Sequence, residues 1–162
     1  SDAGSEFSLL LPEGWVEDLE LGKAMMAEME GEVAAGYVKF FGGNPKVYGY
    51  DPNIFVLSVP VPRGTHLSEL VDAEIRAMGL AIPDQIVIGR ESIFIDGIPA
   101  EKVIHKDASY YRDIFSLQGE VFVIIFLLKD QREWVLQCVA GVLNVTEMAL
   151  CEDTLYLFRF QR

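Results

Sequence analysis

Residues 120–128 read EVFVIIFLL, and this stretch decides the fold. A β-strand places alternate side chains on opposite faces, so a strand with one face in water alternates apolar and polar residues. Here both sets are apolar. One face would carry Phe122, Ile124, Phe126 and Leu128, and the other Val121, Val123, Ile125 and Leu127. The segment is therefore predicted to be an interior strand that is covered on both faces.

The surrounding sequence predicts further short strands joined by tight turns. We expect five strands, at residues 85–95, 98–106, 110–117, 120–128 and 133–140. Asp96-Gly97 is typical of a two-residue hairpin turn, which needs positive φ angles that Gly adopts without strain. Residues 118–119 and 129–132 supply the later turns. This order predicts a five-stranded meander.

The rest of the chain must supply the layers that cover the sheet. Apolar residues recur at three- and four-residue steps between residues 21 and 41, which predicts a long helix. Its stripe consists of Met26, Met29, Val33, Tyr37 and Phe40. Gly31 and Gly36 each weaken such a helix by about 1 kcal/mol, so it is expected to break near one of them.

Two more helices are predicted, at about residues 67–78 and 145–158. Gly79 is expected to close the first, and Asn144 is expected to cap the second. Extended segments are predicted at residues 7–11 and 15–18, and a hairpin is predicted from residues 47–50 and 54–60. Pro60 and Pro62 cannot donate backbone hydrogen bonds, so the latter strand should lie near an edge or end there.

Together these elements predict an α+β domain. The architecture is an α/β/α sandwich around a central, mostly antiparallel sheet of six or seven strands. The chain has 162 residues, 51% of them hydrophobic and 23% charged, which fits a single domain at residues 6–162. Residues 1–5 are interpreted as a tag remnant or the remnant of a stalk.

Charge limits the classes of partner. The net charge of −12 disfavours nucleic acid and anionic membrane surfaces, because phosphate groups would be repelled. No apolar run approaches the length of about 18 residues that a membrane-spanning helix needs. Membrane contact is therefore expected only through an N-terminal anchor outside this sequence.

Cys138 and Cys151 lack the spacing of a metal site. The first falls in the last predicted strand and the second in the last helix, where both could face one interface. We favour two buried free thiols, since Cys behaves as a small hydrophobe. A disulfide is the alternative.

Catalytic chemistry has weak support in the sequence. His105 shares a predicted strand face with Glu101 and Asp107, which could form a carboxylate–histidine cluster, but a solvated strand face is the favoured interpretation. No nucleophile elbow or phosphate-binding loop is present. The acidic groups are interpreted as hydrated helix surface. We therefore expect no catalytic residues, no metal and no cofactor.

Binding is the more promising function. Methionine suits adaptable apolar surfaces, so a Met-rich helix is a candidate docking face. The candidate binding residues are Trp15, Met25, Met26, Met29, Tyr37 and Phe41. The alternative is that this stripe packs against the sheet as core.

Several landmarks resemble the PsbP-like (Mog/PsbP) fold family, in particular its bacterial lipoprotein-type members. They are FSLLLPEGW at residues 7–15, the strand, loop and helix from residues 54 to 78, FIDGIPAEKV at 94–103 and the closing LYLFRF at 155–160. The long helix at residues 21–41 departs from the family. The resemblance implies a non-enzymatic fold that has no shared catalytic residues.

On this basis we expect a non-enzymatic binding or scaffold domain of an exported protein of the cell envelope. Its partner would be a protein or an apolar ligand. One alternative is a cytosolic chaperone for hydrophobic segments of secreted effectors. Another is a hydrolase that uses His105 with Glu101 or Asp107.

Overall fold

The computed structural model describes residues 7–28, 37–42, 53–81, 85–107, 120–141 and 145–161. The described strands are β1 (Phe7–Ser8), β2 (Val16–Glu17), β3 (Tyr37–Gly42), β4 (Asn53–Pro60), β5 (Gln85–Ile95), β6 (Ile98–Asp107), β7 (Glu120–Lys129), β8 (Arg132–Gly141) and β9 (Arg159–Phe160). The described helices are α1 (Leu19–Glu28), α3 (Leu67–Ala81) and α4 (Val145–Tyr156).

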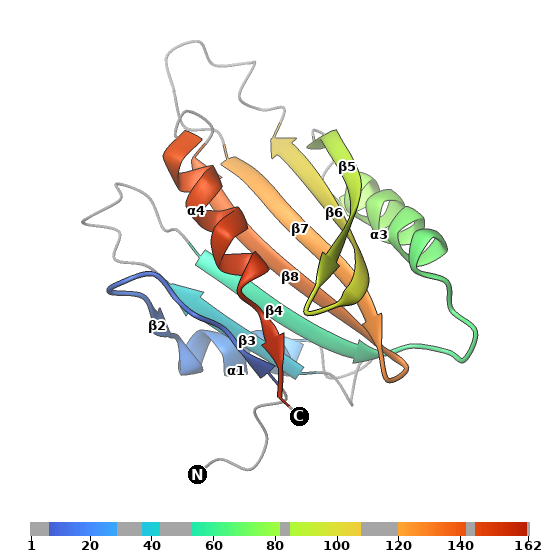
Figure 1. Cartoon of the computed structure of the whole chain (residues 1–162), viewed down its shortest axis with the longest axis horizontal. Coiled ribbons are helices and arrows are strands. Elements are labelled where there is room, and N and C mark those ends of the chain that lie inside the picture. Colours follow the sequence, from blue (N-terminus) through green and yellow to red (C-terminus); the bar gives the residue numbers. More distant parts are fainter. Residues whose placement is uncertain are drawn as a thin grey trace.

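A seven-stranded antiparallel sheet forms the centre of the molecule, in the order β2-β3-β4-β8-β7-β6-β5 (Figure 1). Strand β7 lies between β6 and β8. Both of its faces are buried, as shown by Ile125 at 0% and Phe126 at 2% exposure. The prediction of an interior strand is therefore confirmed.

Helices α3 and α4 cover opposite faces of this sheet (Figure 1). The α4 face holds the larger core, in which Ile125, Leu136 and Leu155 are fully buried. The α3 face holds a smaller core, in which Val71 of α3 meets Val103 and Ile124. Helix α1 lies against β3. The predicted α+β class with helical layers on a central sheet is confirmed.

Two hairpin turns fix the register of the sheet. Asp96 and Gly97 join β5 to β6 with φ angles of 51° and 79°. Asp130 and Gln131 join β7 to β8 with φ angles of 54° and 58°. Positive φ at both central positions matches the right-handed twist of the strands, so both predicted turns are confirmed.

The predicted helix at residues 21–41 is wrong in its second half. Helix α1 ends at Glu28, and Tyr37–Gly42 form β3, which pairs with β4. Residues 29–36, including Met29, lie outside the described residues. Aromatic and β-branched residues in YVKFF favour a strand, and sheet pairing outweighs the helical spacing.

The predicted meander also needs correction. Strand β6 pairs directly with β7, with Val103 opposite Ile124, so no strand from residues 110–117 lies between them. That segment, residues 47–50 and Asn144 lie outside the described residues.

Strand β4 lies between β3 and β8 and not at an edge, although it does end at Pro60 as predicted. The predicted end of the second helix at Gly79 is wrong, since α3 continues to Ala81. The extended segments near the N-terminus form only the two-residue strands β1 and β2.

Candidate functional site

The predicted binding residues do not share one exposed face. Trp15 and Phe41 are 8% and 7% exposed and belong to the core on the α4 face. Met25 and Met26 lie on α1, and Tyr37 begins β3, but their side chains lie outside the description. Neither Trp15 nor Phe41 is available as a contact residue, so the prediction of a Met-rich docking face now depends on α1.

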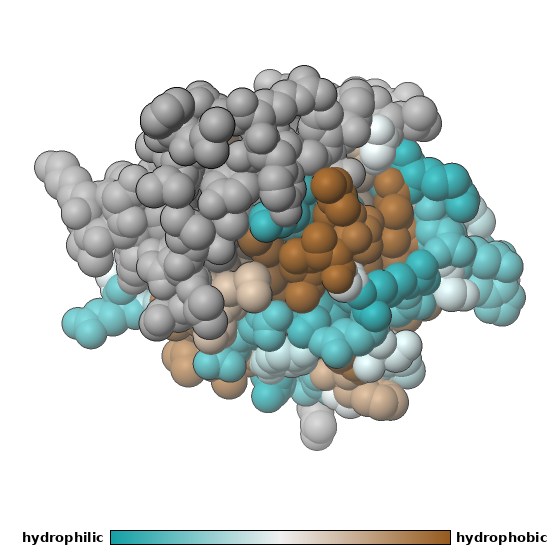
Figure 2. Space-filling model, turned by 90° about the horizontal axis from the view of Figure 1, so that it is seen from above, coloured by the Kyte–Doolittle hydropathy of each residue, from teal (hydrophilic) through white to brown (hydrophobic). Residues whose placement is uncertain are grey.

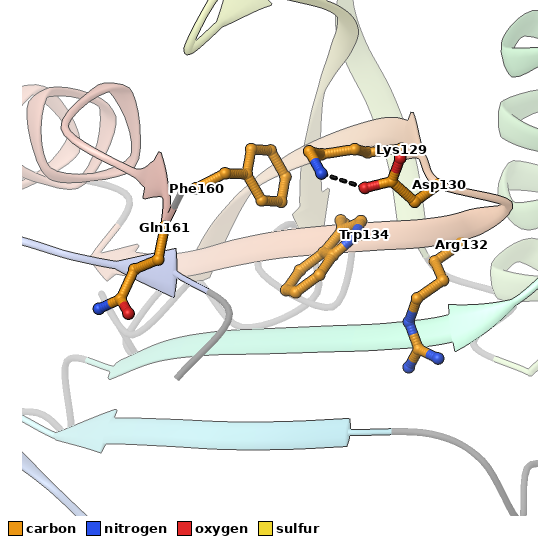
Figure 3. Close-up of a pocket in the computed structure, with 6 residues that line it drawn as sticks. All are labelled: Lys129, Asp130, Arg132, Trp134, Phe160 and Gln161. Atoms are coloured by element: carbon orange, nitrogen blue, oxygen red, sulfur yellow. Dashed lines mark hydrogen bonds and ion pairs between the residues drawn. The ribbon is translucent and has the colours of Figure 1, made fainter. Parts of the chain in front are cut away.

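A hollow of about 210 Å³ lies beside the β7–β8 turn (Figure 3). Its lining consists of Lys129, Asp130, Arg132, Trp134, Phe160 and Gln161. The short pairing of β1 with β9 places Phe160 here, opposite Phe7. The rings of Trp134 and Phe160 meet edge to face at 5.1 Å, and they form the apolar wall of the hollow.

The side chains that line this hollow carry a net positive charge, whereas the whole chain carries a net negative charge. Lys129 and Arg132 contribute two positive charges and Asp130 one negative charge, which leaves one positive charge in excess. Lys129 lies 4.9 Å from the centre of the Phe160 ring and pairs with Asp130, while Arg132 donates to Ser58 Oγ at 2.8 Å. Such a hollow suits an apolar body that carries a negative or polar end.

A second hollow of about 180 Å³ lies beside the same turn. It shares Lys129 and Asp130 with the first hollow and is otherwise lined by Leu128, Gln131 and the loop at residues 61–65. Arg63 donates to the Gln131 side chain at 3.2 Å and joins that loop to the turn. The β7–β8 turn therefore separates two adjoining recesses at one end of the sheet. Sequence analysis did not identify these recesses, because their lining comes from the turn, the loop and the C-terminal segment, which are distant from one another in the sequence.

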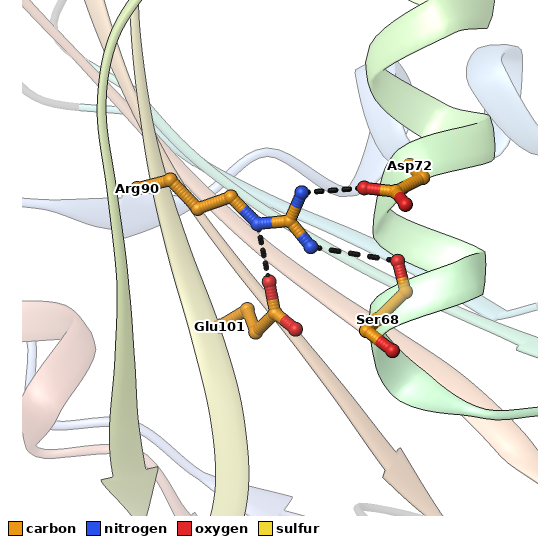
Figure 4. A network of polar contacts seen from close by, with 4 residues as sticks. All are labelled: Ser68, Asp72, Arg90 and Glu101. Atoms are coloured by element: carbon orange, nitrogen blue, oxygen red, sulfur yellow. Dashed lines mark hydrogen bonds and ion pairs between the residues drawn. The ribbon is translucent and has the colours of Figure 1, made fainter.

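Arg90 joins three elements on the α3 face (Figure 4). From β5 its guanidinium donates to Glu101 of β6 at 2.6 Å and to Asp72 of α3 at 2.5 Å. A longer bond reaches the backbone oxygen of Ser68 at 3.4 Å. The bonds to Glu101 and Asp72 raise the pKa of Arg90. The network attaches α3 to the sheet, and it engages Glu101, which the sequence offered as one carboxylate of the less favoured carboxylate–histidine cluster.

His105 is buried, which corrects the prediction of a solvated strand face. It is 2% exposed, and neither ring nitrogen has a hydrogen-bond partner within the described part of the chain. Burial lowers the pKa of His105 and keeps the ring neutral. Glu101 is engaged by Arg90, and the Asp107 side chain lies outside the description. The proposed carboxylate–histidine cluster is therefore not assembled through Glu101.

Glu133 is the second buried titratable group of the α3 face. It is 4% exposed, and its Oε1 atom has no hydrogen-bond partner among the described residues. Burial, with the nearby Glu74 carboxylate, raises the pKa of Glu133 to about 7. Burial also raises the pKa of Glu74. Sequence reasoning missed this pair because Glu133 falls at the start of an ordinary strand pattern.

Helix α4 is attached to the opposite face by polar and covalent links. Lys102 of β6 pairs with Glu91 and, at 3.2 Å, with Glu152 of α4. Burial lowers the pKa of Lys102, but the bonds to both glutamates outweigh that effect and raise it overall.

Cys138 of β8 and Cys151 of α4 form a disulfide, with their Cα atoms 5.6 Å apart. The favoured prediction of free thiols is therefore wrong. Strand β8 and helix α4 pack together and bring both residues to one interface, at 0% and 4% exposure. This link fixes α4 on the sheet covalently.

Apolar side chains also gather at one end of the molecule (Figure 2). The start of edge strand β5 exposes Ile86 by 46% and Ile88 by 56%. A register shift between Val87 and Gly89 interrupts this edge. Bulges discourage pairing with a further strand, so the edge is protected despite its apolar residues.

No protein-family model matches the sequence, and a comparison with curated proteins finds no match. The fold is similar to that of cyanobacterial PsbP (CyanoP) from Synechocystis sp. PCC 6803, with a TM-score of 0.64 and 15% identity. That match covers 99% of this chain and 90% of CyanoP.

Two further structures are similar. LpqN, involved in cell envelope biogenesis of Mycobacterium tuberculosis, matches with a TM-score of 0.56 and 12% identity over 96% of this chain and 83% of LpqN. PA94, a protein of unknown function from Pseudomonas aeruginosa, matches with a TM-score of 0.56 and 8% identity over 72% of this chain and 76% of PA94. At these identities the likeness concerns the fold, and it agrees with the resemblance to PsbP-like proteins.

Proposed function

We propose that this chain is a non-enzymatic binding domain that works outside the cytoplasm, in the cell envelope. The buried Cys138–Cys151 disulfide carries the proposal, because such bonds persist in oxidising compartments. The fold it shares with LpqN supports the same compartment. No helix in the described ranges is long and apolar enough to cross a membrane.

Among the described residues, the hollow beside the β7–β8 turn has a lining that suits a ligand. It combines an aromatic wall, formed by Trp134 and Phe160, with the charged ends of Lys129 and Arg132. Ligand sites commonly join an apolar lining to a few polar groups that fix orientation. We assign this hollow to a protein segment or an apolar ligand with a polar end. The Met-rich helix α1 is the second candidate face.

The disulfide also bears on the chaperone alternative. A cytosolic chaperone would work where thiols are kept reduced, so it would lose the link between α4 and the sheet. Labelling of free thiols in cells that express the protein tests the compartment. We expect an envelope fraction without free thiols. A reduced protein in the cytosol would contradict the proposal.

Photo-crosslinking tests the binding surface. A benzoylphenylalanine would replace Gln161 at the hollow, Met25 on α1, or Glu69 on the exposed side of α3 as the control. We expect a discrete adduct in the envelope fraction from position 161 and none from position 69. An adduct from position 25 alone would move the site to α1. Equal labelling at all three positions would refute a specific site.

A further inference from the structure

The two helical layers are attached to the sheet in different ways. Helix α4 is held by the Cys138–Cys151 disulfide and by the Lys102–Glu152 ion pair. Helix α3 has no covalent link within the described residues. It rests on a small apolar core around Val71 and on the bonds that Arg90 donates to Asp72 and to the backbone oxygen of Ser68. The α3 face is therefore the side that can open while the rest of the domain stays folded.

Glu133 lies at this weaker interface. Side chains alternate along β8, so Glu133 shares a face with Val135, which packs in the α3 core. Its cross-strand neighbours, Val59 of β4 and Leu128 of β7, are not titratable. The carboxyl is 4% exposed and its Oε1 atom lacks a partner among the described residues. Ionising a carboxyl group that is buried in this way costs free energy, because the charge loses its hydration.

The charged neighbour of Glu133 on α3 is another carboxylate. Glu74 lies three residues after Val71 and one before Ile75, on the helix stripe that faces the sheet. Arg76 of α3 lies on the exposed side of the helix, and two cations of the sheet have partners elsewhere. Arg90 pairs with Asp72 and Glu101. Arg132 donates to Ser58, which lies on the same face of β4 as Val56, and Val56 packs in the core under α4, on the opposite face from Glu133. Two ionised carboxylates would repel one another across an apolar layer.

We propose that Glu133 and Glu74 form a pH-dependent latch that holds α3 on the sheet when Glu133 is protonated and releases it when Glu133 ionises. The proton passes to solvent, and α3 moves away so that water can hydrate both carboxylates. Release would uncover the apolar surface of Val103, Ile124 and Phe126. The core on the α4 face, with its disulfide, stays intact.

The direction of the pH effect follows from the shifted titration. Glu133 has a pKa of about 7 in the folded state, raised from an ordinary value of 4.5. The closed form therefore binds one more proton than the open form between those values. Its stabilisation is complete below about pH 4.5 and is lost as pH rises through 7. The latch is therefore strongest below about pH 4.5, weakens as pH rises to 7, and changes little above that.

Hydrogen exchange of the α3 amides, corrected for the intrinsic effect of pH, tests the latch. One proton predicts a loss of protection that approaches tenfold per pH unit between pH 4.5 and 7, or about 40-fold at pH 7 relative to pH 5, and no more than about twofold further loss above pH 7. The α4 amides, behind the disulfide, should keep their protection. Glu133→Gln should remove most of the loss in α3, since only Glu74 then remains to ionise at this interface. Glu69→Gln, which changes an exposed carboxylate on the same helix, should behave as the parent.

Three results would overturn the proposal. They are unchanged protection of α3 between pH 5 and 7, an equal loss in α3 and α4, and a loss in Glu133→Gln that is as large as in the parent. Glu74→Gln provides a second variant if Glu133→Gln fails to fold. It removes the facing charge and should reduce the loss in α3, so a loss equal to that of the parent would also count against the latch.

Discussion

The disulfide between Cys138 and Cys151 makes a quantitative prediction about stability. Replacing both cysteines by alanine removes a cross-link that spans 13 residues of chain. Closing a loop of that length lowers the entropy of the unfolded chain, and this effect corresponds to about 3 kcal/mol at 25 °C. Domains of this size are commonly stable by about 5–15 kcal/mol, so the loss is a large fraction of the total.

Urea unfolding followed by far-ultraviolet circular dichroism measures this loss. The oxidised parent, the parent reduced with a phosphine, and Cys138→Ala/Cys151→Ala should be compared at one pH. We expect the reduced parent and the double variant to lie within about 1 kcal/mol of each other and about 3 kcal/mol below the oxidised parent. Thiol titration of each sample confirms its redox state.

The same experiment can refute the reasoning. If the oxidised and reduced parents unfold at the same urea concentration, with thiol titration showing full reduction, the link does not hold α4 on the sheet. If only the double variant is destabilised, the loss reflects packing of the two buried side chains and not the cross-link.

Three further predictions concern single residues. Since burial lowers the pKa of His105 from 6.5, the contribution of His105 to the unfolding free energy should fall as pH drops below 6.5. The difference between the parent and His105→Leu in urea melts should therefore change with pH in this range, and a difference that does not depend on pH would contradict this. Lys102→Ala should cost about 1–3 kcal/mol, because it leaves Glu91 and Glu152 without their shared cation, and Lys102→Arg should recover part of the loss in thermal melts. Gly97→Ala should cost about 1 kcal/mol, since φ is +79° there although the space for a methyl group is open; a neutral result would show that the turn tolerates the strain.

The sequence alone determined the centre of the fold. A strand that is apolar on both faces must be interior, and β7 is. The Asp96-Gly97 turn, α3 and α4 also follow from local signals, because turn chemistry and helix periodicity act over only a few residues. The need for helical cover on two faces then fixed the α+β class.

The tertiary structure alone decided what depends on contacts between distant segments. Residues Tyr37–Gly42 were predicted to be helical but form a strand that pairs with β4. The hydrogen bonds and side-chain packing of the sheet outweigh the helical spacing of the apolar residues. The packing of α4 on β8 brought Cys138 and Cys151 together, and tertiary packing also buried His105 and Glu133. Redox state and titration follow from burial and proximity, and sequence spacing encodes neither for residues on different elements.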